Sequence, residues 1–469
     1  MMRTRNIIQN TLVCLVFLSL CACEEFVAVD VPNDRITSVS VFADDITARR
    51  AMDGVYSQMF NTNFAAGGNR SVTFLAGLSA DLLDLTGTAG EMEQFAEYTL
   101  DPTNGYNRDL WAGAYNTIYM CNSILEGLLT TDKLNADIET SLEGEAKFIR
   151  AFSYFYLTQL YGDVPLILST DYRENAVAPR TDTLDVNRQI IEDLEQAVVL
   201  LGEEYPDGER TRANRYTAMA LRARVYLYAE DWEQAAYWSG EVLKATGTYS
   251  LAEDPNAVFL ANSNEAIWQI SPAGWGNGFT HTREGNLFIR ISTSGSPVTL
   301  SQHLMELWET GDLRRDAWVG SYSDGSDVYY YPNKYKVRFD YSGGNFTEYS
   351  MVMRLAEQHL IRAEARAYSN DMDGALADID ELRKRANLPL LQDMDMVWTR
   401  DQILKSIALE RQREFFAEWG HRWLDLKRTD SANELLNQDN AFWESTDTLY
   451  PIPADERMKN PNLTQNDGY

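Results

Sequence analysis

Three glutamates on one predicted helix are the residues of this sequence that most resemble paired catalytic carboxylates. Glu410, Glu414 and Glu418 lie four residues apart, so they share one helix face. Two such carboxyl groups could act as the acid and base of a glycoside hydrolase. Basic residues are interleaved with them, namely Arg411, Arg413, Arg422, Lys427 and Arg428. Because neighbouring guanidinium groups hold a carboxylate ionised, the pattern favours a structural ion-pair network over a catalytic pair.

The remaining residues that could bind a metal or act as nucleophiles are scattered. The four histidines are far apart in the chain (His281, His303, His359 and His421), and no His-x-x-x-His or Cys-x-x-Cys spacing occurs. The stretch from Asp324 to Asp327 lacks the oxygen pattern of a calcium loop. A Gly-x-Ser-x-Gly elbow and a phosphate-binding Gly-rich loop are also missing. The sequence therefore predicts a protein without metal, cofactor or catalytic residue.

Aromatic residues in loops are better candidates for a binding site. Trp275 stands between Gly274 and Gly276, which favours neither helix nor strand. An exposed aromatic ring can pack against the C–H face of a sugar, while neighbouring polar side chains bond its hydroxyls. The candidates on this loop are Trp275, Phe279, His281 and Arg283, and those on a second loop are Asn104, Tyr106 and Asn107. Core packing is an equally good interpretation of Trp275, because large aromatic side chains are mostly buried.

An internal repeat indicates what positions these loops. An apolar residue, Arg-Ala, four further residues and a Tyr recur at residues 149–156, 221–228 and 361–368. Each copy has helical periodicity, and in the second and third a short polar turn leads into another periodic helix. Small residues at helix crossings and turns of three or four residues are typical of tetratricopeptide-like helix pairs. The alternative is three unrelated amphipathic helices that share a tripeptide by chance.

The fold class that follows is mainly α, a tetratricopeptide-like scaffold with little β structure. We expect helix-pair repeats at about residues 109–245 and 351–386, preceded by a first helix at 44–60 and a loop at 86–107. Residues 250–349 are rich in Gly, Ser, Thr and Asn with scattered aromatics, which predicts a large irregular insertion that carries the ligand site. A helix at about 400–419 and a nearly structureless strap complete residues 400–469.

The N-terminus predicts export. Residues 1–22 have the charged, apolar and small-residue regions of a signal peptide, and Leu20-Cys21-Ala22-Cys23 has the form of a bacterial lipobox. Cys23 would then carry the lipid, residues 23–40 would form a tether, and residues 41–469 the body. A plain secretory signal is the alternative. Only Cys121 would remain as a free thiol, so no intramolecular disulfide is expected. The net charge of −29 disfavours nucleic acid as a partner.

Five segments together resemble the SusD/RagB family of outer-membrane nutrient-binding lipoproteins of Gram-negative bacteria. They are the lipobox with residues 26–32 (FVAVDVP), residues 148–151 with 160–166, the second repeat copy, residues 410–414 with 418–428, and residues 450–453 with 460–466. These segments occur in the family's order and span the chain.

The resemblance implies a predominantly helical body with four helix-pair repeats and a less regular half that carries the ligand site. It implies a lipid-anchored position on the cell surface, beside a TonB-dependent outer-membrane transporter of the SusC type. Members capture glycans, or in some cases peptides or other nutrients, and no catalysis belongs to the family. Two other functions stay open, a peptide-binding adaptor of the tetratricopeptide type and a glycoside hydrolase that would use Glu410 or Glu414.

Overall fold

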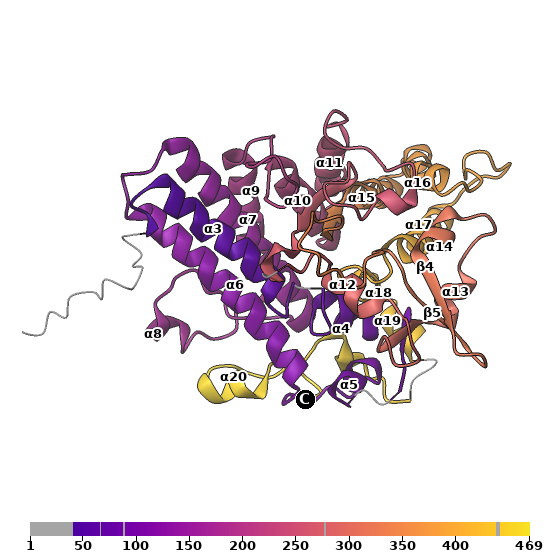
Figure 1. Cartoon of the computed structure of the whole chain (residues 1–469), viewed down its shortest axis with the longest axis horizontal. Coiled ribbons are helices and arrows are strands. Elements are labelled where there is room, and N and C mark those ends of the chain that lie inside the picture. The colour runs from indigo at the N-terminus through magenta and orange to yellow at the C-terminus, as the bar shows by residue number, and fades with distance from the viewer. Residues whose placement is uncertain (1–40, 66, 88–89, 276–277, 438–440) are drawn as a thin grey trace, which may run out of the picture.

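The computed structural model describes residues 41–469, except residues 66, 88–89, 276–277 and 438–440. The predicted signal peptide (residues 1–22), the tether (residues 23–40) and Cys23 therefore lie outside the described residues. The chain is mainly α-helical with three two-stranded sheets among the described residues, so the predicted fold class is confirmed (Figure 1). None of the described helices is both long and apolar enough to cross a bilayer.

Four helices form the N-terminal half of the scaffold, and each is capped by a polar side chain. They are α3 (Asp45–Asn61), α6 (Gly105–Leu129), α7 (Ala136–Tyr161) and α9 (Thr183–Leu200). The side chains of Asp44, Asn104, Asn135 and Asp182 accept hydrogen bonds from the first free N–H groups of these helices. Helix α7 packs between α6 and α9, so its long apolar surface is buried on both sides.

The second half of the scaffold contains the two helix pairs with matching sequence. Helix α10 (Arg215–Tyr228) pairs with α11 (Trp232–Leu243), and α15 (Leu355–Tyr368) pairs with α16 (Met372–Arg385). In both turns an aspartate, Asp231 or Asp371, caps the second helix. Helix α11 packs directly on α15, although about a hundred residues separate them in sequence. Helix α17 (Arg400–Phe415) then packs against α15 and α16.

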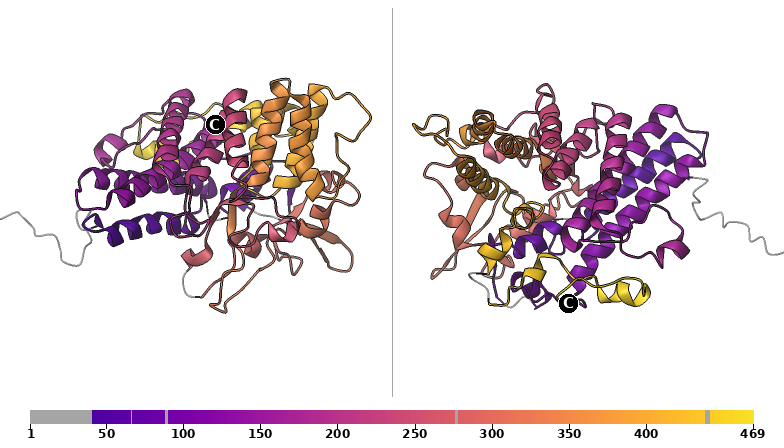
Figure 2. Two further views of the ribbon diagram at one scale, coloured as in Figure 1. Left: turned by 90° about the horizontal axis from the view of Figure 1, so that it is seen from above. Right: turned by 180° about the vertical axis from the view of Figure 1, so that it is seen from behind.

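The insertion leaves the scaffold and returns to it through one pair of strands. Strand β2 (Ala266–Ile270) pairs antiparallel with β6 (Ser350–Arg354), which closes the insertion at its base. Two further antiparallel pairs are β1 (Leu83–Leu85) with β3 (Val298–Leu300) and β4 (Val319–Ser323) with β5 (Val328–Pro332). The short helices of the insertion are α12 (Arg283–Phe288), α13 (Gln302–Glu306) and α14 (Leu313–Trp318). Its loops project away from the helical layer (Figure 2).

Buried arginines connect neighbouring helices of the scaffold. Arg150, from the first repeat copy, bonds the Asp193 carboxylate on α9 at 2.7 Å and the Asn122 amide on α6 at 2.8 Å. Arg224 on α10 bonds the Glu357 carboxylate on α15 at 2.6 Å. The interpretation of Arg150 as a buried scaffold residue is therefore confirmed.

The structure differs from the sequence prediction at the start of one helix and in the C-terminal segment. Helix α6 begins at Gly105 and not near residue 109, because the Asn104 side chain caps it one turn earlier. The C-terminal segment is also less irregular than expected, since it contains α18 (His421–Arg428), α19 (Ala432–Leu436) and α20 (Ala454–Lys459). The last residues are fixed to the scaffold by Asn466, whose amide donates to the Tyr161 carbonyl at 2.9 Å and the Tyr450 carbonyl at 2.7 Å.

Candidate functional site

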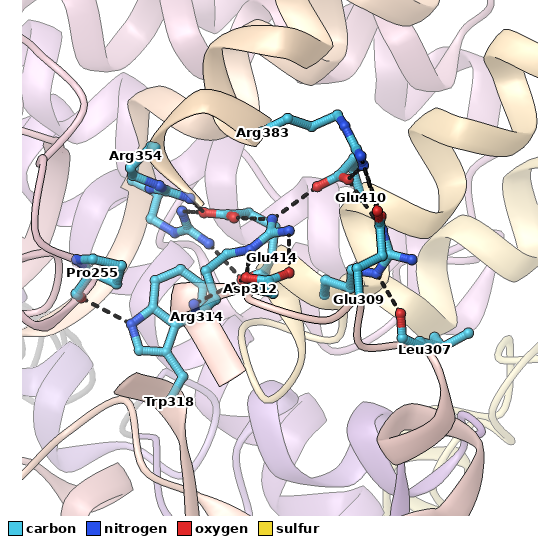
Figure 3. A network of polar contacts seen from close by, with 12 residues as sticks. Pro255, Leu307, Glu309, Asp312, Arg314, Trp318, Arg354, Arg383, Glu410 and Glu414 are labelled. Carbon is cyan, nitrogen blue, oxygen red and sulfur yellow. Dashed lines mark hydrogen bonds and ion pairs between the residues drawn. The ribbon is translucent and has the colours of Figure 1, made fainter. Parts of the chain in front are cut away.

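Glu410 and Glu414 lie in a buried ion-pair network (Figure 3), and Glu418 joins it through Arg354. Arg314 Nη1 lies 2.9 Å from carboxylate oxygens of both Glu410 and Glu414. Arg354 and Arg385 also pair with Glu414, whose side chain is fully buried. Burial alone would raise the pKa of Glu414, but the guanidinium groups of these arginines hold it well below its usual range. The group therefore stays ionised and is unsuited to act as a general acid.

The network also holds the insertion against the scaffold. Asp312 and Arg314 come from the insertion, and Arg354 lies at its return point. Glu410 and Glu414 belong to α17, and Arg385 to α16. The ion pairs thus position the base of the insertion relative to the helices, which supports a structural role.

A group of four aromatic rings, two of them exposed, lies on the insertion, and we call it the aromatic cluster. It consists of Phe279, His281, Phe339 and Tyr341. The rings of Phe339 and Tyr341 are stacked, with centroids 5.9 Å apart and an interplanar angle of 17°. Phe279 meets the Tyr341 ring edge-on at 4.8 Å. The residues come from two segments that are about sixty positions apart in sequence.

Backbone and side-chain hydrogen bonds hold these two segments together. The Thr280 N–H donates to the Asp340 carbonyl and the Gly343 N–H to the Gly278 carbonyl, each at 3.1 Å. The Asp340 N–H donates to His281 Nδ1 at 3.1 Å. His281 is only 1% exposed, so it positions the cluster and cannot contact a ligand directly.

Two rings of the cluster, those of Phe339 and Tyr341, are exposed to solvent. The Phe339 and Tyr341 residues are 47% and 64% exposed, although large aromatic residues are mostly buried. The Arg338 guanidinium lies over the Phe339 ring, 4.2 Å from its centroid. Asp340 and Ser342 alternate with the rings and supply a carboxylate and a hydroxyl. An exposed aromatic surface with hydrogen-bonding groups at its edge is suited to hold a sugar ring.

The other residues of the first candidate loop are Trp275 and Arg283. Trp275 ends the short 3-10 helix η4 (Pro272–Trp275), and its side chain lies outside the described part of the structure. Arg283 begins α12, and its guanidinium lies 5.1 Å from the centroid of the Phe60 ring. Burial lowers the pKa of Arg283, with partial compensation from Glu284. A ligand contact for Trp275 stays a prediction.

The second candidate loop needs a correction. Asn104 and Asn107 are buried, because both belong to the first turn of α6. The Asn104 side chain caps the helix, and the Asn107 amide donates to the Pro451 carbonyl at 2.8 Å. Both side chains are therefore used by the fold and are not available to a ligand. Tyr106 is half-buried, with the Arg70 guanidinium 4.2 Å from its ring centroid.

Sequence reasoning missed Phe339 and Tyr341, the two most exposed rings of the cluster. The available signal was the segment Phe339-Asp340-Tyr341-Ser342-Gly343-Gly344, in which the aromatics alternate with polar residues before two glycines. This is the same local pattern that singled out Trp275.

A buried carboxyl group near the start of α12 predicts a pH-dependent stability. Glu284 on α12 is buried, and its carboxyl group packs directly against Gly67. Ser350 donates to Oε1, whereas Oε2 has no hydrogen-bond partner among the described residues. Burial raises the pKa of Glu284 to about 7, assisted by the charge of Glu348 and opposed by Ser350 and Arg283.

Because the folded protein retains this proton up to about pH 7 and the unfolded chain releases it near pH 4.5, stability falls as pH rises between those values. We expect a loss of about 3 kcal/mol in the free energy of unfolding from this group. Urea unfolding at several pH values should show that Glu284→Gln removes this loss, whereas the exposed control Glu195→Gln does not. Equal pH dependence of Glu284→Gln and the unmodified protein would contradict the prediction.

Comparison with known proteins places this chain beside SusD-like proteins. A family model described as the SusD family matches residues 314–469, and one described as starch-binding and associating with the outer membrane matches residues 56–227. SusD-like protein P2 of Formosa agariphila is 28% identical, over 93% of this chain and 95% of its own. A SusD-like protein of Bacteroides ovatus is 25% identical, over 75% of this chain and 71% of its own.

Solved structures show the same fold. A SusD superfamily protein from Bacteroides vulgatus superposes with a TM-score of 0.81 at 23% identity, covering 91% of this chain and 99% of its own. A laminarin-binding SusD-like protein superposes with a TM-score of 0.77 at 25% identity, covering 91% of this chain and 100% of its own.

Proposed function

This chain is a member of the SusD family, and we propose that it binds a glycan on the cell surface and passes it to a TonB-dependent outer-membrane transporter of the SusC type. Cys23 would carry the lipid anchor, and residues 23–40 would connect it to the body. Under this proposal the protein binds without turnover and needs no metal or cofactor. None of the described residues forms a cluster of histidine, cysteine and carboxylate side chains suited to a metal ion.

The observation that carries the proposal is the exposed, stacked pair of Phe339 and Tyr341. A pair of parallel rings at the surface of an insertion costs solubility and adds little to the core, so a ligand is the simplest reason for it. The groups around it can also bond hydroxyls. Arg338 donates to the Ile289 and Gly295 carbonyls through Nε and Nη2 and has further N–H donors on Nη1, and Asp340 and Ser342 carry oxygen acceptors. Laminarin and starch are the first candidate ligands, because the names of one structural neighbour and one matched family refer to them.

The proposal is tested by isothermal titration of residues 24–469, the body with its tether. The titrants are laminarin, starch and other polysaccharides, with their oligomers. We expect saturable binding to one glycan and no new reducing ends after prolonged incubation. Trp275→Ala and Tyr106→Ala would show whether these rings extend the site beyond the aromatic cluster. Absence of binding across the panel would contradict glycan capture and favour another nutrient or a peptide-binding adaptor, whereas release of reducing sugar would favour a hydrolase.

A further inference from the structure

A large cleft lies on a part of the molecule that does not include the aromatic cluster. Its volume is about 1040 Å³, and none of its lining residues belongs to the cluster. One wall is formed by the three residues of strand β1. Other lining residues come from α13, α15, α17, α18 and α19. The proposed glycan site does not explain this cleft.

Strand β1 lines the cleft, and its edge opposite β3 has unused backbone groups. The Ser301 N–H donates to the Leu82 carbonyl, and the Thr86 N–H donates to the Pro297 carbonyl. In an antiparallel ladder hydrogen-bonded pairs alternate with non-bonded pairs, so Leu83 and Leu85 direct their N–H and C=O groups away from β3. No hydrogen bond to these groups occurs among the described residues, and both residues line the cleft. An open strand edge is a template for a further strand.

The walls of the cleft are suited to the side chains of a peptide. Leu404 and Ala408 of α17 face the cleft from one side, and Leu435 and Leu436 of α19 from another. These apolar groups can receive every second side chain of an extended peptide.

The charges around the cleft favour a basic occupant. The arginines of its floor are already paired, since Arg422 bonds Asp81 at 2.6 Å and Arg411 bonds Asp425 at 2.6 Å. Arg428 bonds Glu364 at 2.6 Å. Asp84, the central residue of β1, is exposed and has no cationic partner among the described residues. A lysine directly across from Asp84 on an added strand would supply one.

The aromatic residues of the cleft are not suited to a glycan. The Tyr98 ring is packed edge-on against Trp443, with centroids 4.7 Å apart, and lies parallel to Trp423. One face of the Tyr368 ring is covered by Trp232, with centroids 3.9 Å apart and an interplanar angle of 9°. The cleft therefore lacks a pair of exposed, stacked rings like that of Phe339 and Tyr341 in the aromatic cluster.

We propose that this cleft binds an extended peptide segment of a partner protein, which adds a strand to the open edge of β1. The segment carries apolar residues opposite Leu83 and Leu85 and a basic residue opposite Asp84. Its backbone then bonds the free N–H and C=O groups of Leu83 and Leu85. This mode of recognition uses the strand edge and is independent of the glycan proposal.

The probe for this proposal is a set of fluorescein-labelled octapeptides with Val-Lys-Val at the centre and varied flanking residues. Fluorescence polarisation with the full body should identify peptides that bind saturably. Each peptide that binds is compared with a control peptide of the same sequence in which both valines are N-methylated. In the proposed complex the N–H groups of these valines would face the carbonyls of Leu83 and Leu85. We expect the N-methylated control peptides to bind at least about tenfold more weakly, because they lose two hydrogen bonds to the protein.

Matched variants locate the peptide on the protein. Asp84→Lys should weaken binding at least about tenfold, whereas Glu253→Lys, which changes charge at another exposed position, should not. Hydrogen exchange should show that the amides of residues 82–86 become protected when the peptide is added. The proposal is overturned if no octapeptide binds, or if the N-methylated control peptides bind as well as the unmodified ones. It is also overturned if Asp84→Lys has no effect on peptide binding, or if the glycan bound by the aromatic cluster displaces the peptide.

Discussion

Replacing Glu414 by alanine should cost more stability than any exposed substitution in this protein, about 3–5 kcal/mol in the free energy of unfolding. Glu414 is fully buried and pairs with Arg314, Arg354 and Arg385. Its removal leaves three buried guanidinium groups with too few carboxylates to pair with. Typical domains unfold at a cost of about 5–15 kcal/mol, so this loss is a large part of the total.

Chemical unfolding monitored by tryptophan fluorescence measures this effect. The matched control is Glu195→Ala, because Glu195 pairs with Arg222 but is itself exposed. An exposed ion pair contributes about 0–1 kcal/mol, so the control should unfold almost as the unmodified protein does. Equal stability of the Glu414→Ala and Glu195→Ala variants would show that the network is not required to hold the insertion on the scaffold.

The second large effect concerns binding. The double variant Phe339→Ala/Tyr341→Ala should weaken glycan binding at least about thirtyfold, because each ring contributes stacking and apolar contact. Both rings are exposed, so the free energy of unfolding should change little. Isothermal titration gives the affinity, and thermal unfolding gives the stability of the same samples.

The matched control for the double variant is Tyr119→Ala. Tyr119 lies on α6, is 52% exposed and does not belong to the aromatic cluster. Its replacement should leave the affinity unchanged. If Tyr119→Ala and the double variant bind the glycan equally, the cluster is not the binding surface.

The scaffold could be predicted because its signals are local. The repeat with Arg-Ala and Tyr marks α7, α10 and α15, and Asp231 and Asp371 mark the turns that follow two of them. The interleaving of glutamates and arginines on α17 likewise predicted ion pairs without knowledge of their partners. The partners themselves, such as Arg314 and Arg354, could not be identified, because they come from the insertion and meet α17 only in the folded chain.

The candidate site was harder to predict for the same reason, because its residues meet only in the folded chain. Phe279 contacts Tyr341 only because hydrogen bonds join two loops about sixty residues apart. The pairing of β2 with β6, which brings the ends of the insertion together, also depends on the whole fold. For Asn104 and Asn107 the sequence prediction named ligand-binding residues that the fold itself uses. Their polarity suggested a ligand, but a helix cap and the C-terminal strap use their hydrogen bonds.

The most direct test of glycan capture at the aromatic cluster is a crystal structure of the body with a bound oligosaccharide. The oligosaccharide is the one that binds most tightly in the titration panel. We predict a sugar ring stacked on Phe339 or Tyr341, with its hydroxyls bonded to Arg338, Asp340 or Ser342. A sugar bound elsewhere, with the Phe339 and Tyr341 rings still in solvent, would contradict this assignment.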